Sequence, residues 1–405
     1  MGSASQETTY TLPDASAPSL VLTHPTETEK HRTWSLNHKE WGGALTLEEY
    51  LKREPYLMSA PLARNGGMTH WILTDSSWSP EKGGERPVLA SCESIRKRVM
   101  VAAPNDTKVR DGVGHGVGSV FTYPEFRGKG YAGRMLRELG PTLRKWQSGD
   151  RDSVCSALWS DIGKHYYTKK GWVAFPSVHA EFAVPISQTQ GSATGEKGRA
   201  NVTSITYDDL EPLCQRDEEL MRSKLLFAAR KSGKTTVAFT PDHDTMRWHM
   251  YRDDFITSII FKTDSPSPIK GAIAGTQEGR RIWALWSRNY HGSNPAETVD
   301  KNTLYILRLV IEPDLKPAQG QPPSAEAREA FRAVMHAAQR EAAQWHCGKI
   351  DLWNPTSTTR KLLEDCELKW RWVDREEDSI PSIMWYGKED IRDVDWVASE
   401  KYCWC

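Results

Sequence analysis

A short glycine-rich segment in the first half of the sequence has the residue types of an anion-binding turn. It lies between a predicted strand at residues 117–122 and a helix whose apolar positions recur from Met135 onward. Glycines let the backbone turn tightly and approach a ligand without a Cβ in the way. The first N–H groups of a helix are unpaired and carry a partial positive charge, which suits a pyrophosphate. The segment, in which two basic residues add charge, reads Arg127-Gly128-Lys129-Gly130-Tyr131-Ala132.

Two motifs resemble those of the GNAT acetyltransferase superfamily. Its cofactor signature is Gln/Arg-x-x-Gly-x-Gly/Ala, and Arg127, Gly130 and Ala132 occupy the three fixed positions. Its second motif, Tyr-x-x-x-Gly-Phe, is matched by Tyr167 to Trp172, with Trp in place of Phe. The resemblance covers residues 19–186. It implies an α+β fold, with a mixed central sheet flanked by helices, and acetyl-CoA as the co-substrate.

The resemblance also implies which residues contact the cofactor. Backbone N–H groups of the strand before the turn hold the acetyl carbonyl in this superfamily, and here that strand contains Val120, Phe121 and Thr122. The pantetheine arm would pair along the same strand. The superfamily often has Asn where this chain has Ser160, so a cofactor contact at that position is an open question.

Tyr167 is implied as the acid that protonates the departing coenzyme A thiolate. A phenol has a pKa near 10, above that of a thiol, so this proton transfer is favourable. A one-residue shift would give the role to Tyr166, and a tyrosine that only packs on the core is the structural alternative. Because these enzymes generally attack directly, Cys92 and Cys155 need no nucleophilic role.

The general base has three candidates. Glu93 and His115 lie on or near predicted central strands, and either can also be an ordinary strand residue. The third candidate is the carboxylate of Cys405, because some two-lobed acetyltransferases place the end of the chain in the active site. An amine such as that of lysine has a pKa of about 10.4 and must lose a proton before it attacks.

The overall composition limits the classes of binding partner that we expect. Lys+Arg and Asp+Glu each total 53, so no net charge draws the chain to nucleic acid or to an anionic membrane. We expect no signal peptide from the polar first 18 residues, and no apolar run is long enough to span a bilayer. Seven scattered cysteines without a Cys-x-x-Cys pair favour reduced thiols and a cytoplasmic protein. No Cys/His cluster has the spacing of a zinc site, so we expect no metal.

The chain divides at a Gly/Ser-rich segment, residues 187–201, which is typical of a linker. We predict a flexible tail at 1–18, a GNAT domain at 19–186 and a second, degenerate GNAT-like lobe at 202–405. The second lobe repeats the order of strand, helix, strand and helix, but it lacks the Arg-x-x-Gly-x-Ala turn. We therefore expect it to bind no coenzyme A and to close the amine pocket, with the tail at 396–405 as part of the lining. A lobe that only stabilises the first, or forms a dimer, is the alternative; the oligomeric state is left open.

The whole chain is similar to the fungal lysine acetyltransferases of lysine catabolism, which implies the side-chain amine of free lysine as the acceptor. The similarity rests on Ser91-Cys92-Glu93-Ser94, on residues 116–132, on Leu158-Trp159-Ser160-Asp161-Ile162-Gly163 and on Leu352-Trp353-Asn354-Pro355. A polyamine, an amino sugar or a xenobiotic amine is the alternative acceptor, and a protein lysine ranks below these. The alternative outside enzymes is a catalytically dead scaffold that binds acyl-CoA.

Overall fold

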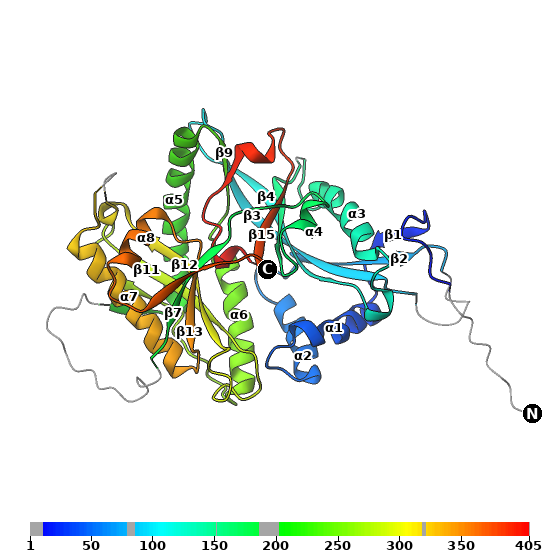
Figure 1. The fold of residues 1–405 in the computed structure, drawn as a ribbon, viewed down its shortest axis with the longest axis horizontal. Coiled ribbons are helices and arrows are strands. Elements are labelled where there is room, and N and C mark those ends of the chain that lie inside the picture. The colour runs from blue at the N-terminus through cyan, green and yellow to red at the C-terminus, as the bar shows by residue number, and fades with distance from the viewer. Residues whose placement is uncertain (1–10, 79–85, 151, 186–201, 318–320, 405) are drawn as a thin grey trace, which may run out of the picture.

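The computed structural model describes residues 11–78, 86–150, 152–185, 202–317 and 321–404. Within these ranges the chain forms two mixed β-sheets with helices packed on their faces (Figure 1). The predicted α+β class is thereby confirmed. The predicted linker at 187–201 lies outside the described residues.

The first sheet carries the predicted cofactor motif. Its central strands are β3 and β4, and the helices α1 (Glu27–Trp41), α2 (Leu47–Met58), α3 (Tyr131–Lys145) and α4 (His165–Thr168) come from the same part of the chain. The strands are, in spatial order, β1 (Leu20–Thr23), β2 (Met68–Asp75), β3 (Ala90–Ala102), β4 (Arg110–Phe121), β5 (Cys155–Ser160), β15 (Ile380–Trp385) and β6 (Val173–Ala174), with β9 (Thr235–Phe239) paired to β3 and β16 (Val394–Trp396) paired to β9.

Alternating residues of β2 show why this sheet is covered on both faces. Trp71 and Leu73 pack in one cluster with the buried residues of α3, whereas Ile72 packs in another, against which Leu36 and Trp41 of α1 also lie. Successive strand residues point to opposite faces, so a strand that is apolar at consecutive positions needs a helix on each side. Helix α3 covers one face of the sheet and α1 covers the other, and this packing holds the turn before α3 in place next to β4.

The second sheet is built mainly from later residues. The helices from this part of the chain are α5 (Tyr207–Ser232), α6 (His243–Ile260), α7 (Ala325–Gln344) and α8 (Ser357–Glu364). The Ala-rich face of α7 packs on the second sheet, whereas α5 packs mainly on β3 and β9 of the first. The strands are, in spatial order, β14 (Trp370–Asp374), β7 (Val178–Ala183), β13 (Lys349–Trp353), β12 (Thr303–Ile311), β11 (Ile282–Asn289), β10 (Gly271–Ala274) and β8 (Val202–Ile205).

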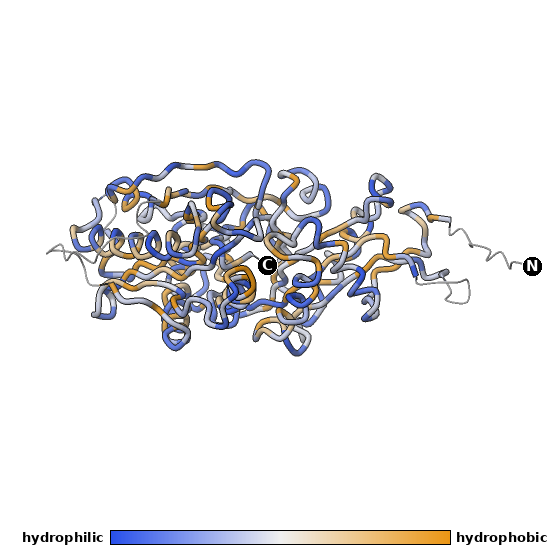
Figure 2. The backbone as a smooth tube through the Cα atoms, turned by 90° about the horizontal axis from the view of Figure 1, so that it is seen from below, coloured by the Kyte–Doolittle hydropathy of each residue, from blue (hydrophilic) through white to orange (hydrophobic). Residues whose placement is uncertain are grey.

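The two sheets exchange strands across the predicted division of the chain. Strand β7 precedes residue 187 but lies in the second sheet, while β9, β15 and β16 follow residue 201 and lie in the first. One buried apolar cluster takes residues from both sheets, including Ala157 and Leu307. In Figure 2 hydrophobic segments accordingly run through the middle of the molecule where the two halves meet. The halves therefore share part of their core.

Each sheet contains a central parallel strand pair, and in the first sheet β16 also pairs in parallel with β9. Strands β4 and β5 pair as far as Val117 and Leu158, and β12 and β13 pair as far as Ile306 and Leu352. In both sheets the first strand of the pair continues past the last paired residue, then leads through a 3-10 turn (η2, Pro124–Phe126; η4, Pro313–Leu315) towards a long helix. The two halves therefore repeat the same order of strand, turn, helix and strand, as the sequence predicted.

The two ends of the described chain pack at different places. Residues 11–18, part of the predicted tail, contact α3, and the Tyr131 hydroxyl donates to the carbonyl of Pro13 over 2.6 Å. The C-terminal turn η6 (Lys401–Cys403) contacts α6 and β12 in the middle of the molecule (Figure 1). No helix in the described ranges is both long enough and apolar enough to span a bilayer.

Candidate functional site

A cavity of about 590 Å³ opens where β4 and β5 separate beyond their last paired residues. Two strands that diverge leave backbone groups without a neighbouring strand, which is where an extended ligand can bind. Four of the predicted cofactor residues, Val120, Phe121, Thr122 and Arg127, line it. The other lining residues are Glu40, Trp41, Val117, Gly118, Ser119, Leu158, Trp159, Asp161, Ile162, Tyr167 and Trp404.

The predicted anion turn continues directly from this cavity. Gly128 and Gly130 have φ values of +78° and +84°, a region that favours glycine, and Gly130 is the N-cap of α3. The Arg127 guanidinium donates to the Thr122 carbonyl over 3.2 Å and lies 3.4 Å from a carboxylate oxygen of Glu40. Lys129 is exposed. The start of α3 thus presents N–H groups beside two basic side chains, as a pyrophosphate site requires.

Two residues of the turn differ in what they can contribute. Tyr131 is buried, and its hydroxyl bonds to a carbonyl, so its side chain belongs to the core. Ala132 is partly buried. Only the backbone of these two positions is therefore available to an anion at the helix start.

Tyr167 and its neighbour lie on the short helix α4 with different surroundings. Tyr167 lines the cavity, whereas Tyr166 packs beside it at a ring distance of 5.2 Å and is not among the lining residues. Burial raises the pKa of the Tyr167 phenol above its usual value, so the hydroxyl keeps its proton at neutral pH. It is the tyrosine of the pair that can donate a proton into the cavity.

Glu93 lies directly behind the cavity wall. A β-bulge between β3 and β4 gives Ser119 a φ of +53°, and the Ser119 hydroxyl donates to Glu93 Oε2 over 3.2 Å. His70 Nε2 lies 3.4 Å from Glu93 Oε1. Burial tends to raise the pKa of Glu93, but His70 and Ser119 outweigh it and hold the pKa below its usual value. Glu93 is therefore ionised and reaches the cavity through Ser119.

Two other predicted site residues, His115 and Ser160, lie away from the cavity. His115 is fully buried within β4, and burial lowers its pKa to about 4, so its imidazole is neutral and enclosed. The buried hydroxyl of Ser160 donates to the carbonyl of Gly163 over 2.7 Å and closes a local turn. Neither residue is among those that line the cavity. Cys405 lies outside the described residues.

A second, smaller cavity of about 200 Å³ lies between the two halves. It shares Glu40, Trp41, Asp161 and Trp404 with the first, so these four side chains form the junction. Most of the remaining lining residues belong to α6, β11, β12 and η6. The full set is Gly42, Gly43, Arg53, His249, Arg252, Asp253, Ile256, Ser287, Arg288, Asn289, Tyr290, His291, Tyr305, Ser379 and Lys401.

This second cavity is what sequence reasoning mostly missed. The aromatic tail at 396–405 gave one signal, and Lys401 and Trp404 of that tail do line the cavity. Arg252 lies inside an amphipathic helix, where an arginine is normally a solvated residue. Only the packing of α6 between the halves turns it inward.

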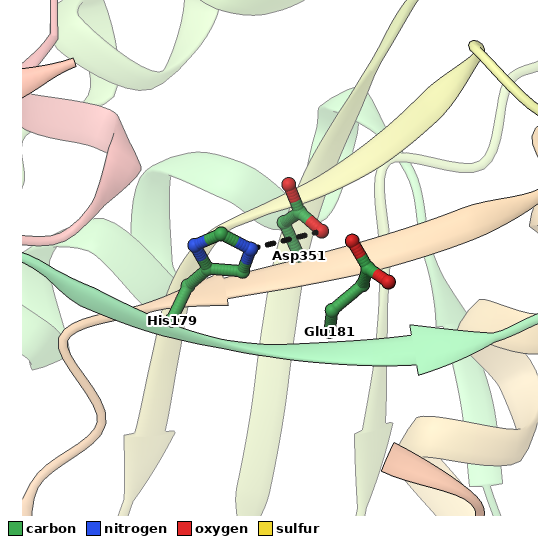
Figure 3. Close-up of side chains that lie close together, drawn as sticks. All are labelled: His179, Glu181 and Asp351. Carbon is green, nitrogen blue, oxygen red and sulfur yellow. Dashed lines mark ion pairs between the residues drawn. The ribbon is translucent and has the colours of Figure 1, made fainter. Parts of the chain in front are cut away.

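A group with metal-ligand side chains lies on the second sheet. His179 and Glu181 of β7 and Asp351 of β13 have ligand atoms within 4.8 Å of one another (Figure 3). Basic neighbours already engage Glu181, since Arg371 Nε donates to it over 2.7 Å and Lys349 Nζ lies 3.6 Å away. These two cations would compete with a metal ion for the carboxylate, so we assign no metal-binding role to the group.

Comparisons with known proteins agree with this architecture. Residues 183–405 match the family described as the LYC1 GNAT-like C-terminal domain, and the chain belongs to this family. The match confirms the predicted superfamily and the enzyme class, an acyltransferase of the GNAT type.

Two curated fungal proteins are similar over most of the chain. A lysine acetyltransferase from Yarrowia lipolytica is 25% identical over 303 residues, 67% of this chain and 72% of that protein. The uncharacterized protein YGR111W from Saccharomyces cerevisiae is 24% identical over 316 residues, 69% of this chain and 76% of that protein.

Solved structures with a similar fold include a probable N-acyltransferase of unknown function from Enterococcus faecalis. It is 12% identical with a TM-score of 0.49, and the match covers 90% of this chain and 71% of that one. A tandem GNAT protein from the clavulanic acid biosynthesis pathway is 9% identical with a TM-score of 0.45, over 92% of this chain and 99% of that one.

Proposed function

We propose that this protein transfers the acetyl group of acetyl-CoA to the side-chain amine of free lysine. The observation that carries the proposal is the connection between two cavities. The larger one runs to the glycine turn before α3, and the smaller one, between the halves, joins it at Glu40, Trp41, Asp161 and Trp404. A thioester in the first and an amine in the second would meet at the junction.

The first cavity supplies the groups that a coenzyme A thioester needs. The turn at Gly128 and Gly130, with Arg127 and Lys129, would hold the pyrophosphate, and the diverging end of β4 would pair with the pantetheine arm. In the transfer the amine nitrogen forms a bond to the acetyl carbon and the carbon–sulfur bond breaks. Tyr167 would give its proton to the departing thiolate.

The acceptor must lose a proton before it attacks, and Glu93 is our candidate base. It is ionised and reaches the cavity wall through the Ser119 hydroxyl, so a proton would pass along that hydrogen bond or through water. Burial and neutrality disfavour His115 in this role, since an enclosed imidazole does not meet the substrate. The carboxylate of Cys405 remains a further candidate.

The size of the second cavity favours a small acceptor. Pockets for drug-sized ligands usually measure about 300–1,000 Å³, and this one measures about 200 Å³. An amino acid or a short polyamine suits that volume better than a polypeptide. The relative named a lysine acetyltransferase supports lysine among these. The second half would then close the amine pocket, as the sequence led us to expect.

The test is release of free thiol from acetyl-CoA in the presence of single amines. We expect lysine to support the fastest release among amino acids, polyamines and amino sugars. Product analysis should place the acetyl group on the side-chain nitrogen. A protein that binds acetyl-CoA but releases no thiol with any amine would instead be a scaffold, and the proposal would be wrong.

The cofactor site is tested by Gly130→Asp, which adds a carboxylate at the helix start. Gly149→Asp is the matched control, because Gly149 has a φ of +68°, is exposed and follows the far end of α3. Both changes place an aspartate at a positive φ, but a Cβ at Gly130 would also lie 3.3 Å from Ala15, whereas a Cβ at Gly149 would not be crowded. Calorimetry should show loss of acetyl-CoA binding for Gly130→Asp alone. Equal affinity in the two variants would remove the pyrophosphate site from this turn.

A further inference from the structure

Two cations in the cavity between the halves lack acidic partners in the described part of the chain. Arg252, on α6, lies 5.3 Å from the ring centre of Trp404, and Lys401 Nζ lies 4.0 Å from the same ring. Lys401 also lies 4.4 Å from the rings of Tyr305 and Trp353. Aromatic faces attract a cation but do not neutralise it. Neither residue forms an ion pair with a described carboxylate.

The other basic side chains that line this cavity are already neutralised. The Arg53 guanidinium donates to Glu54 Oε1 over 2.5 Å. Arg288 lies 3.1 Å from Asp253 and 3.3 Å from Glu341. Arg252 and Lys401 differ because no described carboxylate lies within ion-pair distance of either, although Glu54 acts on Arg252, and Asp161 and Asp351 act on Lys401, from farther away.

Their surroundings make this isolation costly. Lys401 is only 8% exposed, and Arg252 is partly buried. Burial, and then the charge of Arg252, holds the pKa of Lys401 well below its usual value. Burial, and then the charge of Arg53, lowers the pKa of Arg252 to about 10. Buried charges without a partner are unfavourable. An anion bound between Arg252 and Lys401 would offset the cost of burying their charges and the repulsion between them.

Apart from Asp253, which pairs with Arg288, the acidic groups of the second cavity lie at its junction with the first. Glu40 and Asp161 line both cavities and are exposed in part, so they present negative charge where an amine must arrive. The combined space therefore has acidic groups at the reaction end and uncompensated basic groups along the second cavity. An acceptor with an amine at one end and an anion at the other matches this distribution.

We infer that Arg252 and Lys401 form a binding site for the α-carboxylate of the amino-acid acceptor. The inference rests on the proposed acetyl transfer and deepens it, because it makes the carboxylate the group that separates an amino acid from a simple diamine. A site built to pair a charged group rejects an analogue that lacks it, since the buried partners are then left unsatisfied.

The experiment compares lysine with 1,5-diaminopentane, which is lysine without its carboxylate. Both amines are assayed by thiol release with the wild-type protein, Arg252→Gln and Lys401→Met. Arg247→Gln is the control: Arg247 is on the same helix, donates to the Tyr251 hydroxyl and is not among the residues that line the cavity. Arg252→Lys tests whether a charge alone restores the site.

The wild type should prefer lysine, and Arg252→Gln should lower kcat/KM for lysine about 10- to 100-fold, mainly through KM, the usual loss for a hydrogen bond to a charged group. The same variant should leave 1,5-diaminopentane within about threefold. Lys401→Met should change the ratio in the same direction, Arg252→Lys should recover part of it, and Arg247→Gln should leave it unchanged.

Parallel losses for both amines in Arg252→Gln, or an unchanged preference, would overturn the carboxylate site while acetyl transfer stands. No thiol release from the wild type with any amine would refute the proposed function itself, and the inference with it. The two failures are therefore distinguishable in one set of assays.

Discussion

Replacing Tyr167 by Phe isolates the hydroxyl that faces the thioester cavity. The ring packs in the cluster beneath α3, and Phe keeps that packing. No hydrogen bond is seen from the hydroxyl to another described residue, so the change leaves no orphaned protein partner. We therefore expect the free energy of unfolding to change by less than about 0.5 kcal/mol, as for a substitution without a structural partner.

The kinetic effect should be much larger than the effect on stability. Burial keeps the phenol protonated, so at neutral pH the wild type can always donate this proton. Loss of a positioned general acid typically costs about 10²–10⁴ in rate. Because each tenfold change in rate corresponds to about 1.36 kcal/mol, the variant would lose about 3–5 kcal/mol of transition-state stabilisation. We expect the loss in kcat, with acetyl-CoA affinity nearly unchanged.

The assay is thiol release at saturating acetyl-CoA, with cofactor affinity measured separately by calorimetry. Tyr166→Phe is the matched control, since it removes the same atom from the adjacent residue, which does not line the cavity. A loss in Tyr166→Phe with a normal Tyr167→Phe would show that the motif is shifted by one residue. Normal kcat in both variants would refute leaving-group protonation by either tyrosine.

Three further predictions concern the buried charges, the pH dependence and the tail. Arg308→Ala leaves the carboxylates of Asp217 and Glu400 buried without their cation and should destabilise the protein by about 3–5 kcal/mol in urea unfolding, whereas the exposed Arg392→Ala should cost less than about 1 kcal/mol. Burial lowers the pKa of His115 to about 4, whereas a histidine in the unfolded chain protonates near 6.5. The free energy of unfolding should therefore fall as the pH drops from about 6.5 towards 4, because only the unfolded chain takes up the proton in that range. His115→Gln should make this fall shallower. Trp404→Ala removes a ring from the cavity junction and should raise the amine KM more than it weakens acetyl-CoA binding; the opposite pattern would place the ring on the cofactor side.

Local sequence patterns predicted the elements that carry the cofactor motif. The helix after the glycine turn was expected from apolar residues that recur from Met135 onward, and α3 is there. The prediction started β4 too late, at 117, whereas the strand begins at Arg110. Glycines at alternating positions weaken a strand pattern, and here pairing with β3 and β5 overrides it.

Pairing between distant strands was beyond the reach of those patterns. Strand β15 lies next to β5, and β7 lies between β13 and β14, so each sheet is completed by residues from the other half. Such contacts depend on which edges and faces meet after folding. A linear pattern records only that a segment is extended. The sequence division at 187–201 therefore could not indicate the spatial one.

The sequence by itself determined the anion turn, because glycines at Gly128 and Gly130 before an apolar helix act locally and leave their signal in adjacent residues. It also singled out Tyr167 through a short motif. Only the tertiary structure decided where the proposed amine cavity lies, since Asp161, Arg252 and Lys401 are far apart in the chain and meet through the packing of α6 and η6 between the sheets. Long-range packing sets which charges are buried without a partner, and no local spacing encodes that property.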